Sequence, residues 1–390
     1  MEGKISIFII FEKNMQFKGG RILNLKNALL SVSIISSLFF SSSVSAEPGK
    51  SVDSINGQEE VINVQNKLGV SQNQIDDFIA EASNEVAKEK LMKNLKGLKT
   101  VSEDHIYNYI SVGEDSYYLY EENSNHQKKA MFLPINRKET NVDTSANSSE
   151  SVDAGSDTGD VYLKQGLIST AADLPDGIGG RQYIVKSGTY ISSSVTLASA
   201  AQVSRSTGEN AYTYSGFVAG SNGADMGLMF DSDVGPGGTE TGWKPTMQIN
   251  GSTSNSSFDP SYNQVQSANA YKPGSQVILY AWYNYSGKIR MKIDGTAICA
   301  NLGCSDSNDT LLTTIMTSNT SYNIAASSLN KWKVLSTVTG DNYGKNYAIF
   351  SSIKVDGVAV PSSAFSTPDQ DYATVTRDAS NNVTINTTGL

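Results

Sequence analysis

The stretch VILYAWYNYSGKIRMKI, residues 277–293, decides the fold. It consists of two runs of β-branched and aromatic residues on either side of the turn at residues 285–287, which is the pattern of an antiparallel hairpin. Successive side chains of a strand point to opposite faces, so Ile289, Met291 and Ile293 share one face. Because that face is apolar, the hairpin is predicted to belong to a sheet packed on a core.

The opposite face of the hairpin mixes aromatic, amide and basic groups. Alternation places on it Tyr280, Trp282 and Asn284 from the first strand and Arg290 and Lys292 from the second. Two interpretations stay open. In the first, the aromatic side chains pack beneath another sheet, as large aromatic residues often do. In the second, the face is at least partly wet, because Arg290 and Lys292 are awkward to bury.

The same strand pattern continues through residues 160–390. Short runs of β-branched and aromatic residues recur between clusters of Gly, Asn, Asp and Ser, and no convincing amphipathic helix interrupts them. Such spacing is typical of an all-β sandwich or barrel. We therefore predict an antiparallel β-sandwich over residues 160–390.

Residues 70–138 have a different pattern. Ser71 and Gln74 are spaced as a capping box, and apolar residues recur at helical spacing from Ile75 to Val86. Two tyrosine-rich runs about a turn follow at residues 106–120, with a third apolar run at residues 130–133. These features predict a small α+β module, either a removable pro-region or an accessory module.

The remaining segments are predicted to be an export signal and flexible connections. Residues 1–46 have the basic, apolar and small-residue order of a signal peptide, with Met15 as an alternative start. Residues 47–69 are predicted to be a flexible lead-in. Residues 139–159 are rich in Ser, Asp, Asn and Thr and contain almost nothing apolar, which predicts a disordered linker. The protein is thus expected to be secreted, extracellular or associated with the cell wall.

Composition limits the partners. The chain has 390 residues, of which 38% are hydrophobic and 18% charged, and a formal net charge of −9. An acidic chain without a basic patch lacks the electrostatic footprint of nucleic-acid binding. The apolar run of the signal is too short and too serine-interrupted for a stable membrane-spanning helix. We predict neither a nucleic-acid partner nor membrane insertion, and the oligomeric state stays open.

Four segments carry a family resemblance: residues 225–230 (DMGLMF), 242–248 (GWKPTMQ), 271–276 (YKPGSQ) and 292–295 (KIDG). Their order along the chain resembles the order of strand sequences in concanavalin-A-like jelly-roll domains, over about residues 160–365. The whole chain also resembles the poorly characterised secreted YrpD-type proteins of Gram-positive bacteria. The jelly-roll resemblance implies a concave sheet that binds glycans, or cuts them in glucanases and lyases.

The acidic residues give little support to catalysis. Glycoside hydrolysis normally requires a carboxylate pair, and the paired-acid run of jelly-roll glucanases is missing. Glu209 and Glu240, the two glutamates after residue 150, lie in loop-like surroundings. Residues 160–390 also contain no His to activate a serine nucleophile. We therefore predict no catalytic residues, and keep a polysaccharide-degrading hydrolase or lyase as the alternative.

Metal sites and cysteine chemistry are limited as well. Cys299 and Cys304 are close together in an exported chain and are predicted to form a disulfide. The loops at residues 231–238 and 306–309 offer oxygen atoms for calcium, but neither has EF-hand spacing, and turn chemistry alone supplies such residues. No cofactor is predicted, with calcium as the alternative.

The mixed face is the best candidate site. A glycan presents apolar C–H faces edged by hydroxyls, so its site needs flat aromatic rings flanked by amide and charged groups. Tyr280, Trp282, Asn284, Arg290 and Lys292 supply that mixture, and Trp243 can join them from a neighbouring strand or loop. We expect a non-catalytic, lectin-like protein that binds polysaccharide or cell-wall glycan. A structural protein of the extracellular matrix or spore surface is the second alternative.

Overall fold

The computed structural model describes ten segments: residues 62–95, 105–113, 116–123, 127–134, 177–201, 210–234, 240–250, 270–298, 310–339 and 344–387. The chain divides into Met1–Glu59 and Glu60–Leu390, and every described residue belongs to the second unit. The predicted signal peptide, the predicted linker and both cysteines lie outside the described residues.

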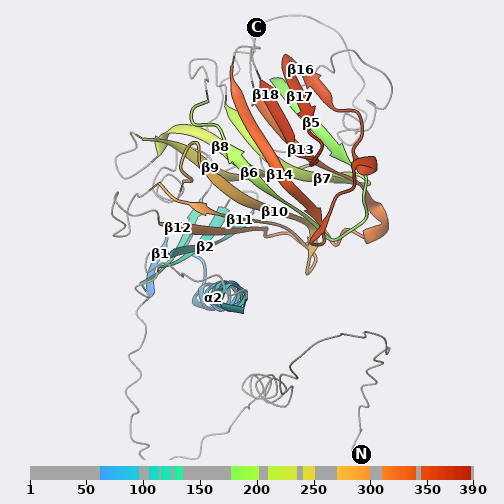
Figure 1. The fold of residues 1–390 in the computed structure, drawn as a ribbon. Helices are drawn as coiled ribbons and strands as arrows, with labels where there is room; N and C mark the ends of the chain where they lie inside the picture. Colours follow the sequence, from blue (N-terminus) through green and yellow to red (C-terminus); the bar gives the residue numbers. More distant parts are fainter. Residues whose placement is uncertain are drawn as a thin grey trace, which may run out of the picture. The chain divides into compact units, whose positions relative to one another are not determined.

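The chain is mainly β, as predicted, and two sheets make up most of the described unit (Figure 1). The twelve-strand sheet contains, in spatial order, β1 (Ile62–Asn66), β4 (Lys128–Pro134), β3 (Ser116–Asn123), β2 (His105–Val112), β12 (Leu311–Ser318), β11 (Lys288–Thr296), β10 (Gln276–Tyr285), β6 (Tyr190–Leu197), β14 (Asn346–Val355), β18 (Val383–Thr387) and β17 (Ala373–Arg377), with β15 (Val358–Ala359) paired to β14. The six-strand sheet contains β16 (Asp369–Asp371), β5 (Gly177–Ile184), β13 (Leu329–Thr339), β7 (Ala211–Ala219), β8 (Asn222–Val234) and β9 (Glu240–Ile249). Two short 3-10 helices, Ala326–Ser328 and Ser362–Ala364, lie in the connections.

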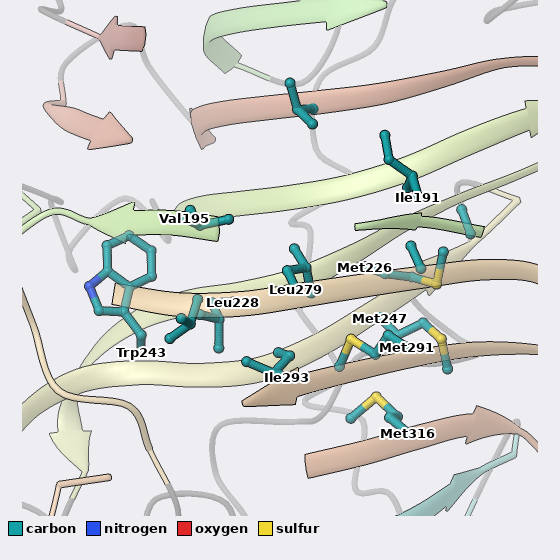
Figure 2. Packing of buried hydrophobic residues seen from close by; sticks show 14 of the residues in the cluster. Ile191, Val195, Met226, Leu228, Trp243, Met247, Leu279, Met291, Ile293 and Met316 are labelled. Carbon is teal, nitrogen blue, oxygen red and sulfur yellow. The ribbon is translucent and has the colours of Figure 1, made fainter. Parts of the chain in front are cut away.

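The inner faces of the two sheets form the core. Figure 2 shows Met226, Leu228, Trp243 and Met247 of the six-strand sheet packed with side chains of the twelve-strand sheet, among them Ile191, Leu279, Met291, Ile293 and Met316. The predicted alternation of the hairpin is confirmed, because Ile289, Met291 and Ile293 are all buried in this core. The opposite side of each sheet is called its outer face below.

The predicted helix is present as α2, Gln72–Leu95. Its capping box forms as expected: the Ser71 backbone N–H donates to Gln74 Oε1 at 3.0 Å, and the Gln74 N–H donates to Ser71 Oγ at 3.4 Å. The apolar stripe of the helix then packs on the outer face of the twelve-strand sheet. It forms a second cluster, made up of Ile75, Phe78, Ala82, Val86, Tyr107, Tyr109, Tyr120, Ala130, Phe132 and Ile315.

The α+β module continues the sandwich sheet. β2 pairs with β12 in parallel along the whole of both strands, from His105 opposite Leu311 to Val112 opposite Ser318. β1 lies within the predicted lead-in and pairs in parallel with β4, so that segment is not wholly irregular. One sheet therefore runs through both regions that the sequence patterns divide into module and sandwich.

α2 is the one α-helix among the residues that the structure describes. No helix in these segments is long and apolar enough to cross a membrane.

Candidate functional site

The outer face of the β10–β11 hairpin lies at the middle of the twelve-strand sheet. Pairing of β11, β10 and β6 aligns its residues in rows: Arg290, Trp282 and Tyr190 in one, Lys292, Tyr280 and Ser192 in the next, and Asp294, Ile278 and Ser194 in the third. On β10 these side chains are two aromatic rings and Ile278, on β11 they are two cations and Asp294, and on β6 all three carry a hydroxyl group. The aromatic and basic groups of the predicted mixed face therefore share one face of the sheet, on neighbouring strands.

Three rings on this face form an aromatic strip, defined here as Tyr190, Tyr280 and Trp282. The Tyr280 and Trp282 rings are stacked, with centroids 5.7 Å apart and planes 15° apart. The Tyr190 ring centroid lies 5.3 Å from that of Trp282. All three side chains are partly exposed, and the neighbouring Ile278 is 43% exposed. The strip thus lies on the outer face of its sheet, away from the sandwich core.

Arg290 and Lys292 are buried beneath α2, which corrects the expectation that they keep the face wet. They are only 4% and 8% exposed. Arg290 Nη1 donates to Glu85 Oε2 at 2.5 Å, and Lys292 Nζ donates to Glu89 Oε1 at 2.8 Å. The physical reason is that α2 brings carboxylates to both cations, which makes their burial tolerable.

The titration of these groups reflects the pairing. Burial alone would raise the pKa of Glu85, but hydrogen bonds from Lys88 and Arg290 hold that pKa below its ordinary value. Burial alone would lower the pKa of Lys292, but Asp294 and Glu89 raise it above the ordinary value. Both groups therefore stay charged at neutral pH.

The buried cations also touch the aromatic rings. Lys292 Nζ lies 4.4 Å from the Tyr280 ring centroid, and Arg290 Cζ lies 5.7 Å from that of Trp282. Arg290 Cζ is closer still to the Tyr285 ring centroid, at 3.9 Å. These cation–π contacts hold the strip from the side that α2 covers.

Asn284 and Trp243 have other roles. Asn284 accepts from the Gly287 N–H at 2.8 Å and donates to the Ile324 carbonyl at 2.7 Å, so its amide holds the hairpin turn. Trp243 lies on β9 of the other sheet, is 0% exposed and donates its indole N–H to the Ala198 carbonyl at 3.0 Å. Its prediction as a ligand residue is corrected, because it faces the core between the sheets.

A polar cluster that the sequence did not reveal lies where β2 meets the sandwich. Thr313 Oγ1 is 2.8 Å from His105 Nε2 and 2.7 Å from Asp294 Oδ1, and Lys93 Nζ is 3.0 Å from Asp294 Oδ1. Burial, with the nearby Lys93 next in importance, lowers the pKa of His105 to about 3. Thr313 is 0% exposed, so a substrate has no access to its hydroxyl. The cluster joins the module to the sandwich.

The outer face of the six-strand sheet carries a second set of ionic groups that the sequence did not reveal. Lys333 pairs with Asp225 at 2.7 Å, Arg181 pairs with Asp369 at 2.7 Å, and Lys244 pairs with Asp231. Lys331 lies beside them, 3.5 Å from the Tyr183 ring centroid. Burial lowers the pKa of Lys331, and the charges of Arg181 and Lys333 lower it further, whereas Asp369 acts in the opposite direction. The sequence signal for Lys333 and Lys244 was the alternation of charged and apolar residues along β13 and β9.

The remaining candidates lie at or beyond the limits of the described segments. Glu209, both cysteines and residues 306–309 are outside them, and Glu240 is the first residue of β9. Within the described segments, no group of three or more His, Cys, Asp or Glu side chains is placed to hold a metal ion.

Comparison with known proteins gives a family. Residues 171–387 match the family described as “Domain of unknown function, YrpD”. A Bacillus subtilis (strain 168) protein, “Uncharacterized protein YrpD”, is 31% identical over 215 residues, which cover 53% of this chain and 80% of that protein.

Solved structures give weaker likenesses. Scytalido-glutamic peptidase, in complex with a transition state analog inhibitor, has a TM-score of 0.33 and 9% identity over 55% of this chain and 99% of its own. SCP-B, a peptidase of the eqolisin family in complex with the tripeptide Ala-Ile-His, has a TM-score of 0.32 and 10% identity over the same shares. Likenesses of this size carry no argument about the chemistry of the chain.

Proposed function

The chain belongs to the YrpD family, and we propose that it is an exported, non-catalytic protein that binds carbohydrate through the aromatic strip. Its ligand is a polysaccharide or cell-wall glycan, met outside the cell or at the wall. The observation that carries this proposal is the position of Trp282 and Tyr280, whose rings stack on the outer face of the twelve-strand sheet while remaining partly exposed.

The chemistry around the strip suits a sugar. A pyranose ring offers an apolar C–H face to an aromatic ring and hydroxyl groups at its edge, so it needs rings beside hydrogen-bonding side chains. Ser194 of β6, which is partly exposed, lies directly opposite Ile278, in the row next to that of Tyr280. Gln276 and Thr196 form the next pair along these strands. A chain of sugar units can follow this surface with stacking on one side and hydroxyl contacts on the other.

Binding without hydrolysis is favoured by the state of the nearby acids. A glycosidase needs one carboxyl with a raised pKa to protonate the leaving group. Glu85 has a lowered pKa. Burial alone would raise the pKa of Asp294, but the charges of Lys292 and Lys93 hold it below its ordinary value. Neither acid can serve as a proton donor at neutral pH.

The test uses the full chain with insoluble neutral polysaccharides and purified cell walls. Trp282→Ala should lose saturable binding by about tenfold or more, the loss expected when one aromatic contact is removed, while Tyr347→Ala, an exposed aromatic on β14, should bind like the wild type. Both variants should keep the wild-type far-ultraviolet circular dichroism. Equal binding by wild type and Trp282→Ala, or release of soluble sugar by the wild type, would overturn the proposal.

A further inference from the structure

Three cations stand in a row beside the aromatic strip. Lys288, Arg290 and Lys292 occupy alternate positions of β11, so they share its outer face. Each pairs with an acid of α2: Lys288 with Glu81 at 3.1 Å, Arg290 with Glu85 at 2.5 Å and Lys292 with Glu89 at 2.8 Å. These three cations are called the cationic row below. It runs along β11, whereas the rows described above cross from strand to strand.

The two sets of charges match because their repeats are similar. Positions four apart in a helix are separated by about 6 Å, and alternate positions of a strand by about 6.6–6.8 Å. The spacing of the three glutamates along α2 therefore matches the spacing of the three cations along β11. A linear polymer that carries carboxylates along its length offers the same kind of group to this strand.

The helix leaves part of this row unsatisfied. Arg290 is 4% exposed, yet in the part of the chain that the structure describes its Nε has no hydrogen-bond partner. A buried guanidinium with an unused donor is costly, and a planar carboxylate is a natural partner for the guanidinium fork. Because Arg290 and Lys292 also contact Trp282 and Tyr280, a ligand on the cationic row would be continuous with one on the strip.

The helix belongs to a segment that lies outside the residues matched by the family, although its strands continue the same sheet. The family match begins at residue 171, whereas α2 lies at Gln72–Leu95. In the apolar cluster beneath α2, Ile315 is the one buried member from the matched region, and the others come from residues 75–132. The apolar contacts of α2 are thus mostly internal to its own module, and its contact with the hairpin is mainly ionic.

We propose that the cationic row is a binding site for acidic polysaccharide and that α2 covers it with glutamates that take the place of the ligand's carboxylates. The inference deepens the proposed function and rests on it for the adjoining strip. When α2 is in place, the strip alone is open. When α2 is displaced, the strip and the cationic row form one site that takes a polyuronate.

The test compares two ligands with one backbone, polygalacturonate and its fully methyl-esterified form, using the full chain in affinity electrophoresis. Glu85→Gln with Glu89→Gln removes the helix carboxylates that pair with Arg290 and Lys292 and leaves Lys292 only its partner Asp294 on β11, which favours opening of the helix. This double variant should bind polygalacturonate about tenfold more tightly than the wild type or better, and the gain should fall as salt is raised. Asp76→Asn with Asp77→Asn makes the same charge change on exposed helix positions and should produce no gain.

Two further variants identify the cause of a gain. Phe78→Ala weakens the apolar contacts of α2 without changing a charge, and it should also raise affinity for polygalacturonate. Adding Arg290→Gln and Lys292→Gln to the Glu85→Gln, Glu89→Gln variant should remove the gain. A gain that survives this addition would overturn the proposal. Faster solvent exchange of the α2 backbone amides would show that the helix opens in a folded variant. If such a variant binds polygalacturonate no more tightly than the wild type, the proposal is also overturned.

The outcomes separate the two proposals. If Trp282→Ala leaves binding of the methyl-esterified polymer unchanged, the proposed function of the strip fails. A gain for polygalacturonate that depends on Arg290 and Lys292 would still support the cationic row. If Trp282→Ala reduces binding of the methyl-esterified polymer but no variant of α2 gains affinity for polygalacturonate, the proposal of a covered site is refuted and the proposed function of the strip is supported.

Discussion

Trp243 and Trp282 are expected to give opposite results when each is replaced by alanine. Trp243 is fully buried between the sheets, meets the Phe230 ring edge-on at 5.3 Å and donates to the Ala198 carbonyl. Trp282 is partly exposed on the outer face and contacts Tyr190, Tyr280 and Arg290. Trp243→Ala should therefore reduce stability, and Trp282→Ala should mainly reduce glycan binding.

The size of each effect follows from these surroundings. Removal of a buried Trp side chain costs about 3–5 kcal/mol, and the unpaired Ala198 carbonyl places Trp243→Ala toward the upper end. Loss of partly exposed aromatic contacts at Trp282 should cost about 1–2 kcal/mol. A difference of about 3 kcal/mol between the variants changes the folding equilibrium more than a hundredfold, which is large beside a domain stability of about 5–15 kcal/mol.

Urea unfolding of the full chain, followed by far-ultraviolet circular dichroism, measures both free energies without relying on tryptophan fluorescence. Trp243→Phe keeps an aromatic ring but loses the indole N–H, so its stability should lie between those of wild type and Trp243→Ala. If Trp243→Ala is too unstable to purify, the comparison of Trp243→Phe with Trp282→Phe serves the same purpose. Equal midpoints for the two alanine variants, or loss of glycan binding in a folded Trp243→Phe variant alone, would refute the reasoning.

Two further predictions concern stability. The folded-state pKa of His105 is lowered from 6.5 to about 3, so the unfolded chain binds a proton that the folded chain rejects, and this contribution to stability is lost as pH falls from about 6.5 toward 3. The free energy of unfolding should therefore drop by about 1 kcal/mol between about pH 7 and about pH 5.5 relative to His105→Gln, and parallel pH profiles of the two proteins would contradict this. In the β7–β8 hairpin, a Cβ at Gly216 would lie 2.0 Å from the Ala224 carbonyl oxygen, whereas one at Gly223 would be 3.5 Å from its nearest atom. Gly216→Ala should cost about 1–3 kcal/mol in thermal or urea unfolding and Gly223→Ala less than about 0.5 kcal/mol, so equal costs would count against this backbone contact.

Local patterns predicted the local structure well. The capping box at Ser71 and Gln74 marks the start of α2, and alternation in the hairpin gives the correct core face. Trp243 was misplaced although a signal existed: Trp243, Met247 and Ile249 alternate with Lys244 and Gln248 along β9. That period of two assigns Trp243 to the core face, as the structure shows.

Long-range pairing could not be predicted in the same way. β12 has the sequence LLTTIMTS and is buried on both faces, by the core on one side and by the module on the other, so it lacks the usual alternation. Its partner β2 lies far away in the chain, in the module before the predicted linker, and nothing local to either strand specifies their parallel register. The position of His105 beside Thr313 depends on this register, which is why the sequence did not reveal their cluster.

The burial of Arg290 and Lys292 was unpredictable from the hairpin for a related reason, since it depends on two adjacent stripes of α2. One stripe is apolar, at Ile75, Phe78, Ala82 and Val86, and packs on β2, β3, β4 and β12. The other is acidic, at Glu81, Glu85 and Glu89, and meets the cations of β11. An acidic stripe on a helix usually faces water, and its contact with a sheet can be recognised only when a strand with matching cations is known to lie beneath it.

The same module also covers an edge of the family domain. Without β2, the backbone N–H and C=O groups on one side of β12 would be left open to pair with another chain. β2 satisfies that edge along its whole length while α2 neutralises the neighbouring cations. Displacement of α2 alone would therefore free the cationic row and leave the edge of β12 paired, but it would expose the apolar cluster that α2 shares with β2, β3 and β4, whereas loss of the whole module would expose the row and the edge together. A ligand that opens the helix must therefore offset the exposure of this cluster, and Phe78→Ala lowers that cost.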